Sequence, residues 1–221
     1  MQNHAGLLVE TITGGPFVQN CFVVADEATR HALVVDPGNV APPILEAVRT
    51  MEVQVQALFA THGHIDHVSA AADLVDELDV PFLIHPLDRE WLTYIAQQCR
   101  AFGLPPHQAP ERVEELAGGQ VIELGTKRSE VILTPGHSAG GVCLHFAEQG
   151  VVFAGDTLFA GSIGRTDLPG GSMETLLTSI RTKLLTMPDE TVVYTGHGPA
   201  TRVDRERTSN PFLGAGARRW Y

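Results

Sequence analysis

Short runs of β-branched and apolar residues fill the first third of the chain, and turn-forming residues separate them. The runs are GLLVETI from Gly6, NCFVVA from Asn20 and HALVVDPG from His31. Gly-Gly-Pro and the polar segment DEATR lie between them. Apolar runs of this length bounded by turn signals predict strands, so we expect neighbouring strands in a meander.

Helical spacing alternates with these strands in the next part of the chain. Helices are predicted from Pro43 to Met51 and from Ser69 onward, because apolar residues recur there on one face. VQALFAT and PFLIH read as strands. A further helix contains Trp91 and Cys99, and the proline-rich segment GLPPHQAPE ends it as a surface loop.

A second strand-rich region follows. It contains VIELG, EVILTPG, VCLHFA and VVFAGD, then the glycine-rich loop FAGSIGRTDLPGGS, a helix from Met173 to Leu185 and the strand TVVYTG. This order predicts an α/β protein in which two sheets pack face to face with helices on the outside. No segment has the composition of a linker, so we expect one domain over residues 1–221.

Composition narrows the functional classes. The 221 residues are 43% hydrophobic and 19% charged, which is enough apolar surface for a large core. A net charge of -11 argues against nucleic acid as a partner. No leader-like segment or apolar run of roughly 18 residues is present, so we expect a cytoplasmic protein without a membrane partner. The three cysteines lack metal-site spacing, and we interpret them as buried side chains.

The segment THGHIDH, residues 61–67, directly follows the strand VQALFA. His62 and His64 are two positions apart, so they point the same way from an extended segment. Asp66 and His67 lie where the chain turns into a helix and could aim at a second point. Neutral imidazoles and carboxylates are ligands for zinc and similar ions. Because four such side chains cluster at a strand end, metal binding explains them better than a solvated loop does.

Three later strands also end in a turn that carries a ligand-type side chain. These are His137 in ILTPGHSAGG, Asp156 in VVFAGDTLF and His197 in VVYTGHGPA. Each alone could be a capping or turn residue. Their common position at strand ends, together with the first cluster, favours a shared metal site.

The motifs THGHIDH, TPGHSAGG, FAGDTLF and TGHGPAT, in this order and spacing, resemble the metallo-β-lactamase superfamily, and within it the glyoxalase II-like hydrolases. The resemblance runs from about Gly6 to Asn210. It implies an αββα sandwich with a two-metal site at one edge of the sheets. We expect two Zn²⁺ there, with Fe²⁺ or Mn²⁺ as alternatives.

The resemblance also implies the role of each side chain. His62, His64 and His137 would bind the first metal. Asp66, His67 and His197 would bind the second, and Asp156 would bridge the two metals. Asp66 would in addition orient the attacking water and move a proton.

Arg165 is the only cation of the glycine-rich loop GSIGRTDLPGG. Related thioesterases have a basic residue near this place that contacts the substrate, so Arg165 is a candidate substrate anchor. The alternative is a structural turn in which Arg165 pairs with Asp167. Glyoxalase II enzymes carry a further C-terminal helical domain that binds glutathione, and we expect this chain to lack it.

Three functions remain open at this point. The first is hydrolysis of a small-molecule thioester or ester, such as S-D-lactoylglutathione, by a hydroxide that bridges the metals. The second is a mononuclear iron persulfide dioxygenase using His62, His137 and Asp156, which the GRTD segment suggests. The third is a binding module in which the metals only stabilise the fold. The sequence leaves the oligomeric state open.

The other five histidines have no partner motif, and we interpret them as structural or exposed, with support of a metal ligand as the alternative. They are His4, His31, His85, His107 and His145.

Overall fold

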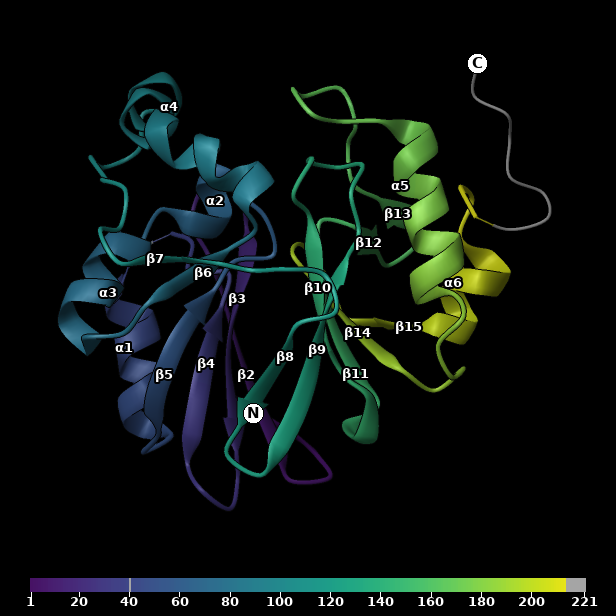
Figure 1. Cartoon of the computed structure of the whole chain (residues 1–221), viewed down its shortest axis with the longest axis horizontal. Coiled ribbons are helices and arrows are strands. Elements are labelled where there is room, and N and C mark those ends of the chain that lie inside the picture. The colour runs from purple at the N-terminus through teal and green to yellow at the C-terminus, as the bar shows by residue number, and fades with distance from the viewer. Residues whose placement is uncertain (40, 214–221) are drawn as a thin grey trace.

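The computed structural model describes residues 1–39 and 41–213. Residues 40 and 214–221, which the expectation of one domain includes, lie outside this part of the chain. Two sheets form the centre of the molecule and helices lie on both outer sides (Figure 1). The predicted αββα architecture is therefore confirmed.

The first sheet has seven strands in chain order, and it is mixed. Its first four strands pair antiparallel, and the last four are joined by parallel pairs. The strands are β1 (Gln2–His4), β2 (Leu7–Gly14), β3 (Gln19–Asp26), β4 (His31–Val35), β5 (Gln54–Phe59), β6 (Phe82–Ile84) and β7 (Val113–Glu115).

The second sheet has six strands in the order β15-β14-β11-β10-β9-β8, and only the β11 and β14 pair is parallel. A two-stranded hairpin of β12 and β13 stands apart from it. The strands are β8 (Val121–Leu124), β9 (Lys127–Leu133), β10 (Val142–Phe146), β11 (Val151–Gly155), β12 (Leu158–Phe159), β13 (Ser162–Ile163), β14 (Val192–Thr195) and β15 (Thr201–Arg202).

Helices cover the outer face of each sheet (Figure 1). Those beside the first sheet are α1 (Ala41–Thr50), α2 (Ile65–Val68), α3 (Ala71–Leu78), the 3₁₀ segment η1 (Pro86–Tyr94) and α4 (Ile95–Phe102). Those beside the second are α5 (Met173–Ser179), its π-helical continuation η3 (Ile180–Leu184) and α6 (Val203–Ser209). A short 3₁₀ turn, η2 (Ala147–Gln149), connects β10 and β11. No helix in the described ranges is long and apolar enough to cross a membrane.

Alternation along the strands explains why the layers form. In β3, Phe22 and Val24 belong to the core between the sheets, whereas Cys21 and Val23 belong to the core under the outer helices. Side chains of a strand point to opposite faces in turn, so a strand covered on both sides must be apolar at nearly every position. All eight residues of β3 are buried, and the five in its middle, residues 21–25, are apolar.

Several boundaries differ from the sequence prediction. The expected helix around Trp91 is a 3₁₀ segment up to Tyr94 and becomes α-helical only at Ile95, and the expected helix from Ser69 starts at Ala71. The glycine-rich loop contains the short hairpin β12–β13, and β1, β7, β15 and α6 were not anticipated. These elements are short, and tertiary packing rather than local pattern determines them.

Candidate metal centre

The seven side chains predicted as ligands come together at one edge of the two sheets. His62 and His64 lie in the loop after β5, and Asp66 and His67 lie on the short helix α2. The other three follow strands of the second sheet: His137 comes after β9, Asp156 after β11 and His197 after β14.

Backbone hydrogen bonds hold the two sheets together at this edge. The amide of Val142 donates to the carbonyl of Thr61 at 2.8 Å, and the amide of Asn20 donates to the carbonyl of Gly196 at 2.8 Å. Each bond joins a residue next to a candidate ligand to the other sheet. The ligand loops are therefore fixed relative to one another by the backbone.

Three imidazoles make the first group. His137 Nε2 lies 2.9 Å from His64 Nδ1 and 3.2 Å from His62 Nε2. All three residues are buried. A cation between these nitrogens would meet three of the four ligands of a tetrahedral site.

The second group combines two imidazoles with a carboxylate. His197 Nε2 lies 3.1 Å from Asp66 Oδ2 and 3.4 Å from His67 Nε2. Asp156 lies between the two groups, with Oδ1 3.3 Å from His67 Nε2 and Oδ2 3.6 Å from both His137 Nε2 and His197 Nε2. The bridging role that the family resemblance implies for Asp156 stays a prediction.

The protonation pattern of the rings tests whether a cation fits here. His137 Nδ1 donates to the carbonyl of Arg165 at 2.8 Å, and His197 Nδ1 donates to the carbonyl of Phe17 at 3.0 Å. A carbonyl only accepts, so in the neutral tautomer the inward Nε2 of each ring carries a lone pair. His67 is held in the same way through Nδ1.

The lone pairs of these imidazoles and the carboxylate oxygens therefore face one another at the centre of the site, with few hydrogen-bond donors among them. Asp156 Oδ1 is buried without a hydrogen-bond partner. Buried acceptors that face one another are costly unless a cation lies between them. The atoms that could bind a metal are nitrogen and oxygen only, and such ligands suit Zn²⁺, Fe²⁺ and Mn²⁺. The residues present fit a metal centre.

Electrostatics keep His62, His64 and Asp156 in their ligand forms. Burial and the nearby imidazole of His67 lower the pKa of His62 well below its usual value, and burial with His137 lowers the pKa of His64 to about 3. Burial alone would raise the pKa of Asp156, but the imidazoles of His67 and His137 outweigh it and lower that pKa. Neutral imidazole and ionised carboxylate are the states that bind metals. Burial lowers the pKa of His67 and of His197, but the carboxylates around them outweigh burial and raise both pKa values.

A family model described as the Metallo-beta-lactamase superfamily matches residues 14–197 of the chain. The chain belongs to this superfamily. Among curated relatives, hydroxyacylglutathione hydrolase GloC of Haemophilus influenzae is 36% identical over 208 residues, which cover 93% of this chain and 97% of that protein.

Three solved structures are similar along nearly the whole chain. BLEG-1 B3 metallo-beta-lactamase is 35% identical, with a TM-score of 0.86, over 93% of this chain and 99% of that one. TTHA1623 in a di-iron-bound form is 38% identical, with a TM-score of 0.84, over 92% of this chain and 100% of that one. ETHE1 from Myxococcus xanthus is 25% identical, with a TM-score of 0.75, over 93% and 84%. One of these similar proteins was solved with two irons bound. The chain is a metallo-hydrolase superfamily member of glyoxalase II-like type.

Asp36 supports the centre of this superfamily member and was missed by the sequence reasoning. Its Oδ2 lies 2.9 Å from His67 Nδ1, and its two oxygens accept the amide and the hydroxyl of Thr61 at 2.6 and 2.8 Å. Thr61 Oγ1 in turn contacts His62 Nδ1 at 3.1 Å. Asp36 directly follows β4, so its position at a strand end was the signal that could have identified it.

Asp88 is a second buried carboxylate that the sequence reasoning missed. Its Oδ2 accepts the amide of Gly63 at 3.0 Å, and its Oδ1 accepts the amide of Gly140 at 2.6 Å. Gly63 lies between His62 and His64, and Gly140 follows His137 by three residues. One carboxylate from η1 therefore ties together both loops of the first ligand group. No pattern in the sequence marks it.

Arg165 contributes to the centre through its backbone, which accepts the His137 hydrogen bond. Its guanidinium is exposed and donates twice to Asp167, at 2.8 and 2.7 Å. This is the structural pairing considered as the alternative. A contact of Arg165 with substrate stays a prediction.

The remaining histidines and the cysteines lie apart from the ligand groups. Each of the three clusters capable of holding an ion in the described residues consists only of the seven predicted ligands. His4 Nε2 contacts the hydroxyl of Tyr194 at 2.8 Å, and His85 accepts the amide of Leu87 at 3.3 Å at the start of η1. All three cysteines are buried and free, as expected.

Proposed function

We propose that the chain is a metal-dependent hydrolase that cleaves a thioester of the S-D-lactoylglutathione class. The observation that carries the proposal is the complete set of seven converging ligand side chains in a chain that is 36% identical to a hydroxyacylglutathione hydrolase over nearly its whole length. The expected partner is a small-molecule thioester or ester.

The proposed ligand sets follow the two groups of side chains. His62, His64 and His137 would hold one ion, Asp66, His67 and His197 would hold the other, and Asp156 lies between the two groups. When bound, two divalent cations supply positive charge that polarises the acyl carbonyl and lowers the pKa of water toward neutrality. We expect Zn²⁺ as the native metal, with Fe²⁺ or Mn²⁺ as alternatives.

Asp66 is the proposed proton carrier. Its carboxylate is the most exposed of those in the centre, at 15%, and its Oδ2 lies 3.1 Å from His197 Nε2. Burial raises its pKa, but the imidazoles of His67 and His197 outweigh burial and hold that pKa below the usual range. The ionised carboxylate can accept a hydrogen bond from water and orient it toward the acyl carbon. A thiolate leaving group needs little proton assistance, because thiol pKa values are about 8.5.

A persulfide dioxygenase is the second candidate. The similarity to ETHE1 from Myxococcus xanthus and the GRTD segment at Gly164 favour it. It would use His62, His137 and Asp156 around one iron. The second group, in which Asp66, His67 and His197 lie within reach of one ion, supports the hydrolase instead.

The deciding experiment combines metal analysis with two assays. Protein loaded with Zn²⁺, Mn²⁺ or Fe²⁺ is tested on S-D-lactoylglutathione and a panel of thioesters and esters, and oxygen uptake is measured on glutathione persulfide. We expect hydrolysis, two metals per chain, and loss of turnover in His62→Ala and Asp156→Ala but not in Asp76→Asn, an exposed change on α3. One iron per chain with oxygen uptake and no hydrolysis would identify the dioxygenase.

A further inference from the structure

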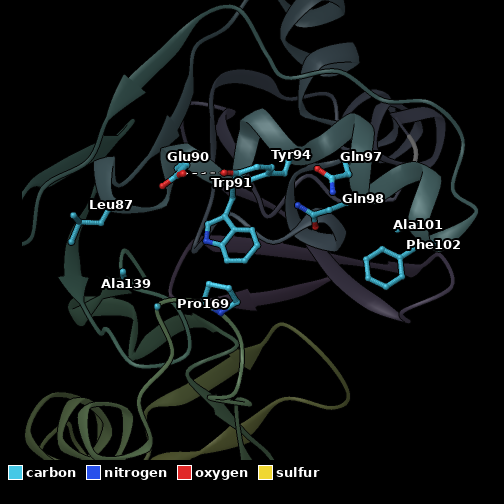
Figure 2. A pocket seen from close by; sticks show the side chains of 11 residues that line it. Leu87, Glu90, Trp91, Tyr94, Gln97, Gln98, Ala101, Phe102, Ala139 and Pro169 are labelled. Atoms are coloured by element: carbon cyan, nitrogen blue, oxygen red, sulfur yellow. Dashed lines mark hydrogen bonds between the residues drawn. The ribbon is translucent and has the colours of Figure 1, made fainter.

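A cavity of about 590 Å³ opens beside the metal centre and has no role in the proposed ligand set. Figure 2 shows its side chains, with η1 and α4 on one side and Ala139 and Pro169 on the other. Its volume falls in the range of small-molecule sites. The eleven residues around it are Leu87, Glu90, Trp91, Tyr94, Gln97, Gln98, Ala101, Phe102, Ala139, Pro169 and Gly170.

Trp91 separates the cavity from the first ligand group and contacts both. The indole ring packs edge-on against the imidazole of His64, with 4.8 Å between ring centroids. On the opposite wall, Ala139 follows the ligand His137 by two residues, and Pro169 belongs to the glycine-rich loop after Asp156. The cavity therefore lies one side chain away from the first ligand group, close enough for a substituent of a substrate whose carbonyl reaches the metals.

The charge of the cavity limits what can enter. Its eleven lining residues include no lysine, arginine or histidine, and its one acid, Glu90, accepts a hydrogen bond from the hydroxyl of Tyr94 at 3.0 Å. Gln97 and Gln98 add uncharged amides, and the other eight residues are aromatic, aliphatic or small. Such a surface favours uncharged apolar groups, and it offers no cation to the carboxylates of a glutathione tail.

We propose that this cavity binds an uncharged apolar substituent of the substrate, so that the chain prefers thioesters with a bulky aliphatic or aromatic group over small hydroxyacyl ones. This inference rests on the proposed hydrolase function, and it makes an apolar thioester, in place of S-D-lactoylglutathione, the preferred substrate of that hydrolase. The apolar group could belong to the acyl part or to the thiol part, because both flank the carbonyl.

Kinetics on two substrate series test the inference. One series varies the acyl group from acetyl to octanoyl and phenylacetyl on mercaptoethanol, and the other varies the thiol of an acetyl thioester from mercaptoethanol to octanethiol. A fully buried methylene increases kcat/KM roughly fourfold, so one series should rise roughly tenfold or more from its smallest to its largest member. The series that rises identifies which part enters the cavity.

Two variants connect the preference to the cavity. Ala101→Trp fills it from α4 and Phe102→Ala removes an aromatic wall, so each should reduce the ratio of kcat/KM between the largest and smallest substrate roughly fivefold or more. Val121→Ala, on β8 in the other sheet, is the matched control and should keep the ratio.

Calorimetric binding of octyl methyl ketone, which cannot be hydrolysed, separates this inference from the proposed function. We expect the ketone to bind the wild type and Val121→Ala, and to bind Ala101→Trp at least tenfold more weakly. Ketone binding without hydrolysis of any thioester would refute the hydrolase function and support the proposed binding of an apolar group in the cavity. Thioester hydrolysis that does not depend on chain length in either series, without ketone binding, would refute the proposal that the cavity binds part of the substrate.

Discussion

His67 and Asp36 face each other inside the protein, with 2.9 Å between Nδ1 and Oδ2 and both side chains almost fully buried. The carboxylate fixes the imidazole so that Nε2 points toward Asp66, Asp156 and His197. The partner of the outer nitrogen sets the tautomer and orientation of a metal-binding histidine.

Asp36→Asn should weaken metal binding at the second group by roughly 10- to 100-fold. Asp36 accepts hydrogen bonds on both oxygens, from Thr61 and from His67, and an amide can accept on only one. Metal retained per chain during titration with a competing chelator measures the loss. Asp76→Asn is the control, and equal affinities in the two variants would contradict the role of Asp36.

Asp88→Asn should destabilise the metal-free protein by about 1–3 kcal/mol. The substitution puts an amide NH₂ against the backbone N–H of either Gly63 or Gly140, so that donor stays buried without a partner. Urea unfolding monitored by circular dichroism measures the change, with Asp73→Asn, exposed on α3, as the control. A change below the experimental scatter would show that the two loops do not depend on this carboxylate.

Gly196→Ala should reduce metal affinity at least roughly tenfold while the protein still folds. A Cβ at this position would lie 2.3 Å from Asp156 Oδ1 and 2.7 Å from His67 Cε1, so at least one candidate ligand must move. Gly14→Ala is the control, since its nearest neighbour, an Asn39 side-chain atom, is 3.9 Å away. Metal content after dialysis distinguishes the variants, and full occupancy in Gly196→Ala would be the opposing result.

Asp26 should make the free energy of unfolding of the metal-free protein fall as the pH is lowered. Burial raises its pKa, but hydrogen bonds from Thr126, Thr29 and Ala28 outweigh burial and lower that pKa to about 2. The stabilisation is therefore complete above the unfolded pKa of about 3.9 and is lost as pH falls toward 2, by roughly 2 kcal/mol in total. Urea unfolding at a series of pH values should show this loss in the wild type and not in Asp26→Asn. If the stability of the wild type and of Asp26→Asn changed equally with pH, Asp26 would be excluded as the cause of the loss.

Removal of the metals should abolish turnover and leave the fold intact. The three apolar clusters pack between the sheets and under the helices, and no candidate ligand belongs to them. Circular dichroism before and after chelation should therefore agree, and added metal should restore activity. Unfolding on chelation would instead support the reading in which the metals only hold the structure together.

The sequence predicted the strands and helices wherever apolar spacing was regular over several residues. It failed at Pro86–Tyr94, where a 3₁₀ segment replaces the start of the expected helix, and at short elements such as β15 and α6. A two-residue strand has no detectable period of its own, and its backbone pairs only because a neighbouring strand is present.

The sequence by itself determined which side chains could bind metal, because ligand residues end four separate strands and their chemistry is local. Only the tertiary structure brought in Asp36 and Asp88, whose function depends on partners that are 25 or more residues away in the chain. It also decided that Trp91 contacts both His64 and an apolar cavity. A hydrogen bond or a cavity wall requires two segments distant in the chain to lie next to each other, and only the packing of the two sheets with their helices brings such segments together.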